Sequence, residues 1–401
     1  MDYKLRCTGC KTGYPPDTSF PRCDICGEPL EVETAFPACI REDEPFGSTI
    51  FARYGEFLPF SDEGRGLTLG EGFTPLVEAH PLAARFHVGR LFLKDESRNP
   101  TWSFKDRGTV TALAHAVALG YGTIGTVSTG NMAASVAAYG ARAGLNAVVL
   151  VSAGTASEKI NPIAIYGARV IRVRGDYGSM YHKSLEIGRS REIYFMNSDV
   201  PFRVEGSKTI AFEICEQCRF NVPDFIVVPT SSGGNFRGIV KGFEEFKRAG
   251  LIDRLPRFVA AQASGCAPIY KAYRERQEIV TPIDEPRTIA GAIANPAPPS
   301  GNAALRKIYE TGGIVAAVGD DEIIEAQREM AGQGIFGQPA AAVPLAAVKR
   351  LVREGEAHPD HSIVCLVTGG GLKYTAAFAH HRFSVSECDL DDLSRCIDDV
   401  L

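Results

Sequence analysis

The stretch KDESRNPTWSFKDRG, residues 94–108, places one lysine between a turn and a run of good helix formers. The Asn99-Pro100 pair favours a turn, and the residues from Lys105 onward favour a helix. Lys105 is therefore expected where a strand gives way to a helix. A lysine that is partly desolvated at such a junction can stay neutral or be held as an imine. A lone Ser-Phe-Lys-Asp string also suits an ordinary surface, so the other motifs decide between the two interpretations.

The overall composition limits the class of protein. The chain has 401 residues, 45% hydrophobic content and a net charge of −5, which allow two or three domains with a large core. A pI near 6.0 argues against a nucleic-acid partner. No apolar run reaches the ~18 residues of a membrane helix, and the N-terminal MDYKLRCTGC has no signal-peptide character. We expect a cytoplasmic protein without a nucleic-acid or membrane partner.

Four cysteines mark residues 1–36 as a separate unit. Cys7 and Cys10 form one Cys-x-x-Cys pair, and Cys23 and Cys26 form another, with twelve residues between the pairs. Each pair can form a tight knuckle that supplies two thiolates to a tetrahedral zinc ion. Because all four positions are cysteine, a structural zinc ribbon is expected rather than a catalytic metal. A ribbon that folds without metal is the alternative.

Beyond a proline-containing linker at residues 37–70, apolar strands alternate with helical stretches. The expected strands are 91–94, 123–128, 146–152, 169–174, 193–197, 225–230, 258–263, 314–319 and 362–369. The expected helices include 131–144, 206–220, 234–249 and 321–333. This alternation is typical of parallel sheets with helices on both faces. The acidic tail, residues 387–401, is expected to form a short surface helix of no readable role.

A phosphate-binding loop is expected after the strand 225–230. The strand runs into Ser231-Ser232-Gly233-Gly234-Asn235 and then into a helix. Backbone N–H groups of such a loop, with the helix N-terminus, attract a phosphate. The glycines allow close approach, and the side chains of Ser231, Ser232 and Asn235 can donate hydrogen bonds. An ordinary turn between strand and helix is the alternative.

Two further strand ends carry polar groups. Thr368 ends an apolar strand and precedes three glycines, at the edge of the sheet where ligands bind in open α/β folds. Its hydroxyl can offer a neutral hydrogen bond. Asn197, Ser198 and Arg203 follow another strand, and a guanidinium suits the geometry of phosphate. These three residues together indicate an anion site, although each one alone also suits a structural role.

The motifs together indicate pyridoxal phosphate. Lys105 can form the imine, the loop 231–235 can hold the phosphate, and Thr368 can pair with the pyridine nitrogen. Lys105 is then both the Schiff-base lysine and the catalytic base.

In these motifs the chain resembles the fold-type II pyridoxal-phosphate enzymes, and within them the threonine synthases. Residues 99–108 are similar to the cofactor-lysine motif of the family, which serine and threonine dehydratases share. The cysteine ribbon is similar to one found ahead of some archaeal and bacterial threonine synthases. The resemblance covers nearly the whole chain after residue 70.

The resemblance implies a role for each cofactor-binding residue. Asn131 would face the ring hydroxyl, the segment 231–235 would hold the phosphate, and Thr368 would lie beside the pyridine nitrogen. The implied fold has two parallel-sheet α/β domains with the cofactor between them, preceded by the zinc ribbon. Within 71–401 the two subdomains would be interleaved, the smaller one spanning about 125–205.

The resemblance also implies the substrate and the assembly. Ser128 and Thr129 would hold the carboxylate of a small amino acid, and Asn197, Ser198 and Arg203 would hold its phosphate. The implied reaction converts O-phosphohomoserine and water into threonine and phosphate. Enzymes of this type usually form homodimers.

Two positions depart from the family pattern and leave alternatives open. The phosphate loop reads Ser-Ser-Gly-Gly-Asn where Gly-Asn-x-Gly-Asn is more usual, and Gly370 stands where the family has a histidine. A cysteate synthase, which joins O-phosphoserine to sulfite, and a serine or threonine dehydratase are the catalytic alternatives. A ligand-binding protein without activity is the third.

Overall fold

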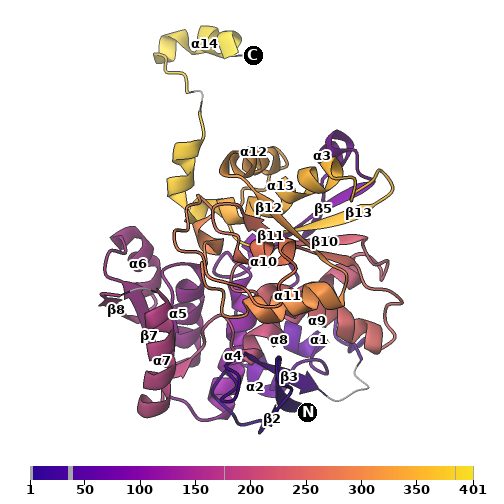
Figure 1. Ribbon diagram of the computed structural model, residues 1–401. Coiled ribbons are helices and arrows are strands. Elements are labelled where there is room, and N and C mark those ends of the chain that lie inside the picture. The colour runs from indigo at the N-terminus through magenta and orange to yellow at the C-terminus, as the bar shows by residue number, and fades with distance from the viewer. Residues whose placement is uncertain (1–2, 35–38, 176, 384, 401) are drawn as a thin grey trace.

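The N-terminal unit is a small antiparallel sheet (Figure 1). The computed structural model describes residues 3–34, 39–175, 177–383 and 385–400. Strand β1 (Tyr3–Cys7) lies between β2 (Gly13–Tyr14) and β3 (Leu30–Thr34) and is antiparallel to both. The expected boundary of this unit at residue 36, like Pro37 of the linker, lies outside the described residues.

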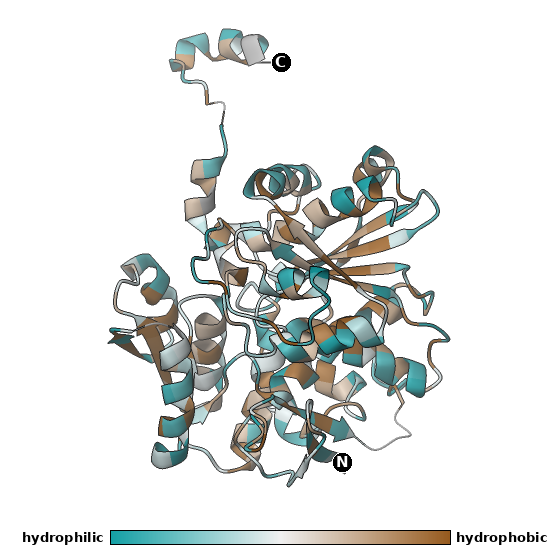
Figure 2. Cartoon of the chain, viewed as in Figure 1, coloured by the Kyte–Doolittle hydropathy of each residue, from teal (hydrophilic) through white to brown (hydrophobic). Residues whose placement is uncertain are grey.

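A large sheet forms the centre of the molecule. Its strand order is β12-β11-β10-β13-β5-β4, and every pair is parallel except β4 with β5. Four central strands are buried along almost their whole length because helices cover both faces. Figure 2 shows these strands as largely hydrophobic. The six strands of the whole sheet are β4 (Leu76–Glu78), β5 (Arg90–Asp95), β10 (Phe225–Pro229), β11 (Arg257–Ala263), β12 (Ile314–Val318) and β13 (Ser362–Val367).

A second parallel sheet is built from the segment that lies between β5 and β10 in the sequence. Its order is β8-β7-β6-β9, with β6 (Thr123–Val127), β7 (Asn146–Ser152), β8 (Arg169–Val173) and β9 (Tyr194–Phe195). Strand β9 is shorter than the expected 193–197. The backbone ladder stops after Met196, and the side chain of Asn197 accepts the next N–H, from Val127.

Helices pack around the two parallel sheets. Helix α13 packs on β10, β11, β12 and β13, whereas α5 packs on β6 and β7. Helix α8 packs on both α4 and α9, between the sheets and the ribbon. The longer helices are α4 (Lys105–Ala118), α5 (Asn131–Ala143), α7 (Tyr177–Arg191), α8 (Pro201–Gln217), α9 (Gly234–Arg248), α11 (Gly301–Glu310), α12 (Asp320–Ala331) and α13 (Pro339–Arg353).

The shorter helical elements lie mainly at the periphery. No described helix has the length and apolar character that crossing a membrane requires. The expected tail helix is present as α14, which projects from the body in Figure 1; Leu401 lies outside the described residues. The shorter α-helices are α1 (Ile50–Arg53), α2 (Ser61–Arg65), α3 (His80–Phe86), α6 (Ser157–Ala164), α10 (Pro268–Arg274) and α14 (Leu393–Val400).

Two glycines let α4 and α8 cross at very short range. A Cβ atom at Gly206 of α8 would lie 2.0 Å from the carbonyl oxygen of Arg107, and one at Gly108 would lie 2.9 Å from that of Arg203. Any larger residue would push the helices apart. The start of α4 is therefore held directly against the start of α8.

The ribbon shares its core with the rest of the chain. Leu5, Leu30 and Val32 belong to the same buried cluster as Phe202 and Phe243. The ribbon is thus packed onto α8 and α9, and its loops can reach the residues at the N-terminal ends of these helices.

Candidate active site

Lys105 is the first residue of α4, at the end of the loop that follows β5. Within this loop Trp102 has a φ of +62°, in the left-handed region that side-chain-bearing residues rarely adopt. Such strain persists only where surrounding contacts hold it, and it is concentrated at functional sites. The junction between strand and helix expected for this lysine is present.

The loop after β13 holds the Lys105 loop. The N–H of Phe104 donates to the carbonyl of Thr368 over 3.1 Å, and the N–H of Gly370 donates to the carbonyl of Trp102 over 3.0 Å. Ser103 and Gly369 form a bridge between these two hydrogen bonds. Lys105 and Thr368, which are far apart in the sequence, therefore share one edge of the large sheet.

The environment of Lys105 favours a neutral amine. Its pKa is lowered to about 7, first by burial and second by the positive charge of Arg203. The Arg203 guanidinium donates to the Lys105 carbonyl over 3.2 Å and to Thr109 Oγ1 over 2.9 Å. Burial lowers the pKa of Arg203 to about 10, so Arg203 stays cationic near neutral pH.

Asp106 and Lys373 fix the loop around Lys105, and the sequence had not singled out either residue. The Asp106 carboxylate accepts from the backbone and hydroxyl of Thr101 over 2.7 and 2.6 Å and from Ser135 Oγ over 2.6 Å. Lys373 Nζ donates to the Thr101 carbonyl over 2.6 Å. Burial raises the pKa of Asp106 and lowers that of Lys373 to about 8.

A buried ion network underlies the loop. Glu213 of α8 accepts from Lys94 Nζ over 2.7 Å and from two nitrogens of Arg107 over 2.5 and 2.8 Å. Arg107 also contacts Glu96 over 2.6 and 2.8 Å. All four side chains are fully buried. Two cations balance two anions, which makes the burial of these charges tolerable.

Asn131, at the start of α5 after strand β6, lies against the same loop after β13 that holds the Lys105 loop. Asn131 Nδ2 donates to Gln338 Oε1 over 3.1 Å, and both side chains lie against Gly369. Ser128 and Thr129 occupy the turn between β6 and α5, where Ser128 Oγ accepts from the N–H of Gly130 over 3.2 Å. Gln338 was missed; a Gln-Pro pair at a helix start is its only sequence signal.

The phosphate-loop residues Ser231–Asn235 form the turn into α9. Gly233 caps this helix with a φ of +92°, and a Cβ there would lie 2.7 Å from the carbonyl oxygen of Ser300. The N–H of Ser300 donates to the carbonyl of Ser232 over 2.9 Å. Both side-chain amide atoms of Asn235 are buried and hydrogen-bond to no described residue.

Of the three expected anion residues, Ser198 lies beside this turn. The carbonyl oxygen of Ser198 would be 2.6 Å from a Cβ on Gly234, and Ser198 Oγ is buried without a described partner. Asn197 is used within the protein, because its oxygen accepts from Val127 over 3.0 Å and its nitrogen donates to Ser184 over 3.0 Å. Arg203 lies in the first turn of α8, and its guanidinium donates to the Lys105 carbonyl.

Sequence comparison with known proteins identifies the family. A family model described as "Pyridoxal-phosphate dependent enzyme" matches residues 67–369. Threonine synthase of Methanocaldococcus jannaschii is 40% identical over 98% of this chain and 99% of its own. That of Methanosarcina acetivorans is 38% identical over 92% of each chain.

The chain belongs to the threonine synthase family.

The expected family, cofactor and enzyme class, a pyridoxal-phosphate-dependent lyase, are thereby confirmed. Among solved structures, diaminopropionate ammonia lyase from Escherichia coli matches with a TM-score of 0.69 over 86% of this chain and 98% of that one, at 17% identity. Maize serine racemase matches with a TM-score of 0.67 over 85% and 96%, at 20% identity. These two likenesses concern the fold, and they confirm the expected fold-type II architecture.

The residues present fit the cofactor of this family. The side-chain amide atoms of Asn235 are buried without a described hydrogen-bond partner. Ser103 Oγ, beside Lys105, is also buried without one. The glycines of the turn into α9 let the backbone approach a ligand closely, and the helix N-terminus adds positive potential. Lys105 itself has the lowered pKa that imine formation favours.

The ribbon brings its four cysteines together. The Sγ atoms of Cys7, Cys10, Cys23 and Cys26 all lie within 4.8 Å of one another. The Sγ atoms of Cys7 and Cys26 are 3.3 Å apart, and those of Cys10 and Cys23 are 3.5 Å apart. Four convergent thiols are the donor set of a structural tetrahedral zinc site.

Proposed function

We propose that this chain converts O-phosphohomoserine and water into threonine and phosphate. The observation that carries the proposal is the guanidinium of Arg203, which lies beside Lys105 and belongs to the segment after Ser198, outside the turn 231–235. A substrate with a phosphate of its own needs a second anion site, whereas serine or threonine does not. The identity of about 40% with threonine synthases over the whole chain supports the same reaction.

Eight residues would hold the cofactor. Lys105 would attach it, Ser231–Asn235 would donate to its phosphate, Asn131 would face its ring hydroxyl, and Thr368 would pair with its pyridine nitrogen. When bound, the cofactor withdraws electrons from the α-carbon of the substrate and makes its proton acidic. The hydrogen bonds between the Phe104 and Thr368 segments support a fixed spacing between Lys105 and Thr368.

The remaining residues would act on the substrate. Ser128 and Thr129 would orient its carboxylate, and neutral Lys105 would accept the α-proton. Arg203 and Ser198 would bind its phosphate and stabilise the negative charge as this group leaves the γ-carbon. Asn197 would contribute with the amide hydrogen that Ser184 does not use.

Product analysis by mass spectrometry tests the proposed reaction. The holoenzyme is offered O-phosphohomoserine alone and, separately, O-phosphoserine with sulfite. We expect threonine and phosphate from the first mixture. Cysteate from the second mixture, without threonine from the first, would contradict the proposal and favour a cysteate synthase. Ammonia released from unphosphorylated threonine would favour a dehydratase.

Arg203→Ala should raise the KM for O-phosphohomoserine by about ten- to a hundredfold, the worth of a hydrogen bond to a charged group. The cofactor should remain bound, because its phosphate is held by another turn. Arg203→Lys keeps the charge and loses the planar fork, so its KM should lie between those of the wild type and Arg203→Ala. Steady-state kinetics measure the KM, and the absorbance of the cofactor shows whether it remains bound. An unchanged KM would remove Arg203 from this role.

The rate should rise with pH through about 7 and then level off. A base acts in its deprotonated form, and the pKa of Lys105 is lowered to about 7. Loss of the Arg203 charge stabilises the protonated amine, so in Arg203→Ala the rise should move to higher pH. A profile of kcat at saturating substrate measures this shift. A rise at the same pH in both proteins would contradict the assigned cause.

We also propose that the ribbon binds one structural zinc ion through Cys7, Cys10, Cys23 and Cys26. The convergent thiols support this proposal. Elemental analysis of the purified protein should find one equivalent of zinc, and Cys26→Ser should lose it with a lower unfolding temperature. Metal-free protein with an unchanged unfolding temperature would contradict a structural metal.

The assembly is likewise proposed. We propose that the ribbon 1–36, the linker 37–70 and the two interleaved subdomains of 71–401, the smaller at about 125–205, act as units in a cytoplasmic homodimer. The separate sheet formed by β6–β9 supports the smaller subdomain. Light scattering after size-exclusion chromatography measures the oligomeric state.

A further inference from the structure

Arg22 of the ribbon reaches the loop that carries Ser198. Its NH1 nitrogen donates to Asp199 Oδ2 over 2.6 Å and to the carbonyl of Pro299 over 3.1 Å. The same nitrogen lies 3.3 Å from the hydroxyl of Tyr181, which also donates to Asp199. The Asp199 side chain is fully buried and that of Arg22 is 17% exposed. This is a desolvated ion pair, in which loss of either partner leaves an uncompensated charge.

Both segments that Arg22 contacts lead directly to the anion-binding residues. Asp199 follows Ser198, whose carbonyl lies against Gly234 at the start of α9. Pro299 precedes Ser300, whose N–H donates to the carbonyl of Ser232 over 2.9 Å. A single guanidinium thus joins the segment of the expected substrate phosphate to the segment that supports the turn 231–235.

The cysteine knuckle orients this guanidinium. Arg22 immediately precedes Cys23, and its Nε donates to the carbonyl of Gly27 over 2.7 Å. Gly27 follows Cys26 in the left-handed region, and its N–H donates to the carbonyl of Cys23 over 3.0 Å. The shape of the second knuckle therefore sets the direction in which Arg22 points.

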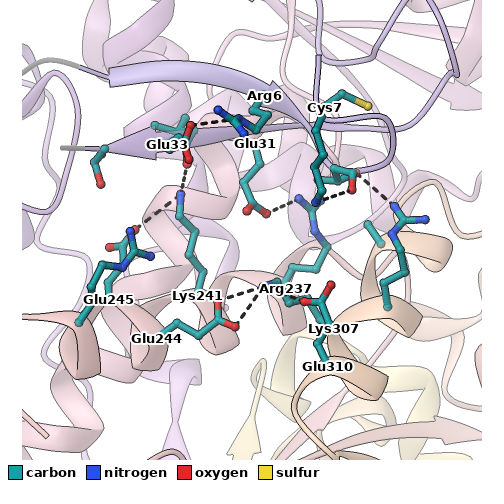
Figure 3. A pocket seen from close by; sticks show the side chains of 17 residues that line it. Arg6, Cys7, Glu31, Glu33, Arg237, Lys241, Glu244, Glu245, Lys307 and Glu310 are labelled. Carbon is teal, nitrogen blue, oxygen red and sulfur yellow. Dashed lines mark hydrogen bonds and ion pairs between the residues drawn. The ribbon is translucent and has the colours of Figure 1, made fainter. Parts of the chain in front are cut away.

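A second contact ties the ribbon to the same region. Figure 3 shows Glu31 of the ribbon facing Arg237 of α9, at a pocket between the ribbon, α9 and α11. Arg237 donates to Glu31 over 2.6 Å and to Ser300 Oγ over 3.3 Å. The ribbon consequently reaches the Ser300 segment twice, directly through Arg22 and indirectly through Arg237.

We propose that Arg22 is a positioning residue for the substrate phosphate. It holds Asp199 and Pro299 so that Ser198 and the start of α9 stay at one spacing, and the knuckle of Cys23 and Cys26 holds Arg22. The ribbon is then a part of the anion site. This inference rests on the proposed function, because it assigns Arg22 to the phosphate site of that reaction.

The test compares variants of the holoenzyme with two measurements. These are the KM for O-phosphohomoserine and the Kd for inorganic phosphate from titration calorimetry. Arg22→Ala should raise the KM and the Kd by about tenfold, a modest share of the worth of a charged hydrogen bond. The kcat and the absorbance of the cofactor should change far less. Arg22→Lys should recover part of the loss. Asp199→Asn should resemble Arg22→Ala, and the double variant should be no worse than either single one.

Arg189→Ala is the matched control. Arg189 of α7 lies 3.6 Å above the ring of Phe20 and so also connects the ribbon to the second sheet. It has no described hydrogen bond or ion pair with Asp199 or Pro299, so this variant should keep the KM and Kd of the wild type. A ribbon that merely stabilises the fold would respond alike to both substitutions.

The outcomes separate the two proposals. If the wild type forms threonine, a KM that is unchanged in Arg22→Ala, or raised equally in Arg189→Ala, overturns the role of Arg22. If the wild type forms no threonine, the proposed function fails and the Kd for phosphate alone decides the role of Arg22. Absence of both threonine and phosphate binding overturns both proposals. Should Arg22→Ala not fold, Arg22→Lys and Asp199→Asn give the same comparison.

Discussion

Replacing Lys105 by alanine should abolish threonine formation and the visible absorbance of the lysine-bound cofactor. The side chain would serve both as the attachment point and as the base, so kcat should fall by at least about a thousandfold. The fold should survive, because Lys105 Nζ forms no described ion pair and its nearest described partner is the Phe104 ring at 4.4 Å. Circular dichroism, absorbance after gel filtration and turnover measure the three effects.

Lys373 provides the discriminating control for this experiment. It is a second lysine with a lowered pKa, about 8, and its Nζ donates to Thr101 beside the Lys105 loop. Lys373→Met should lose some activity through the loop and keep the absorbance of the bound cofactor. Loss of absorbance in Lys373→Met, with retention in Lys105→Ala, would transfer the attachment role to Lys373.

Replacing Glu213 by alanine should destabilise the protein by about 3–5 kcal/mol, the cost of breaking a buried ion pair. The substitution leaves Lys94 and Arg107 with Glu96 as the remaining carboxylate in a fully buried cluster. It also removes the acceptor for the backbone N–H groups of Phe73 and Thr74. Urea unfolding should show a much lower midpoint, and much of the protein should become insoluble during expression.

The exposed pair of Lys183 and Glu186 is the control for this effect. Both side chains are about two-thirds exposed, and such pairs contribute about 0–1 kcal/mol. Glu186→Ala should therefore leave the urea midpoint almost unchanged. A loss of similar size in Glu213→Ala and Glu186→Ala would mean that the buried network adds little to stability.

The ends of the strands could be predicted from the sequence because the residues that mark them are close together in the chain. An apolar strand followed by glycine and hydroxyl residues predicts a loop at the carboxyl edge of a parallel sheet. Ser128, Ser231 and Thr368 all follow such strands, and the structure places each of them in the turn after its strand, whereas Lys105 begins α4 at the end of the longer loop after β5. The expected strands agree with the observed ones to within two residues at every end.

Contacts made across the fold could not be predicted in this way. Gln338 meets Asn131, Lys373 meets Thr101 and Arg22 meets Asp199 only after the sheets and the ribbon have packed. The spacing of residues along the chain does not indicate which of them will form such pairs. Asn197 shows the same limit, since an amide after a strand can face a ligand or replace a backbone acceptor, and here it accepts from Val127.

The position of β13 has a consequence for protein synthesis. This strand is the last of the large sheet to leave the ribosome, yet it lies between β10 and β5. A nascent chain that lacks it exposes two unpaired strand edges and has no support for the Lys105 loop. Cofactor capture therefore has to wait until the chain has been made through β13. Interrupted translation should yield substrates for chaperones and proteases rather than a partly active enzyme.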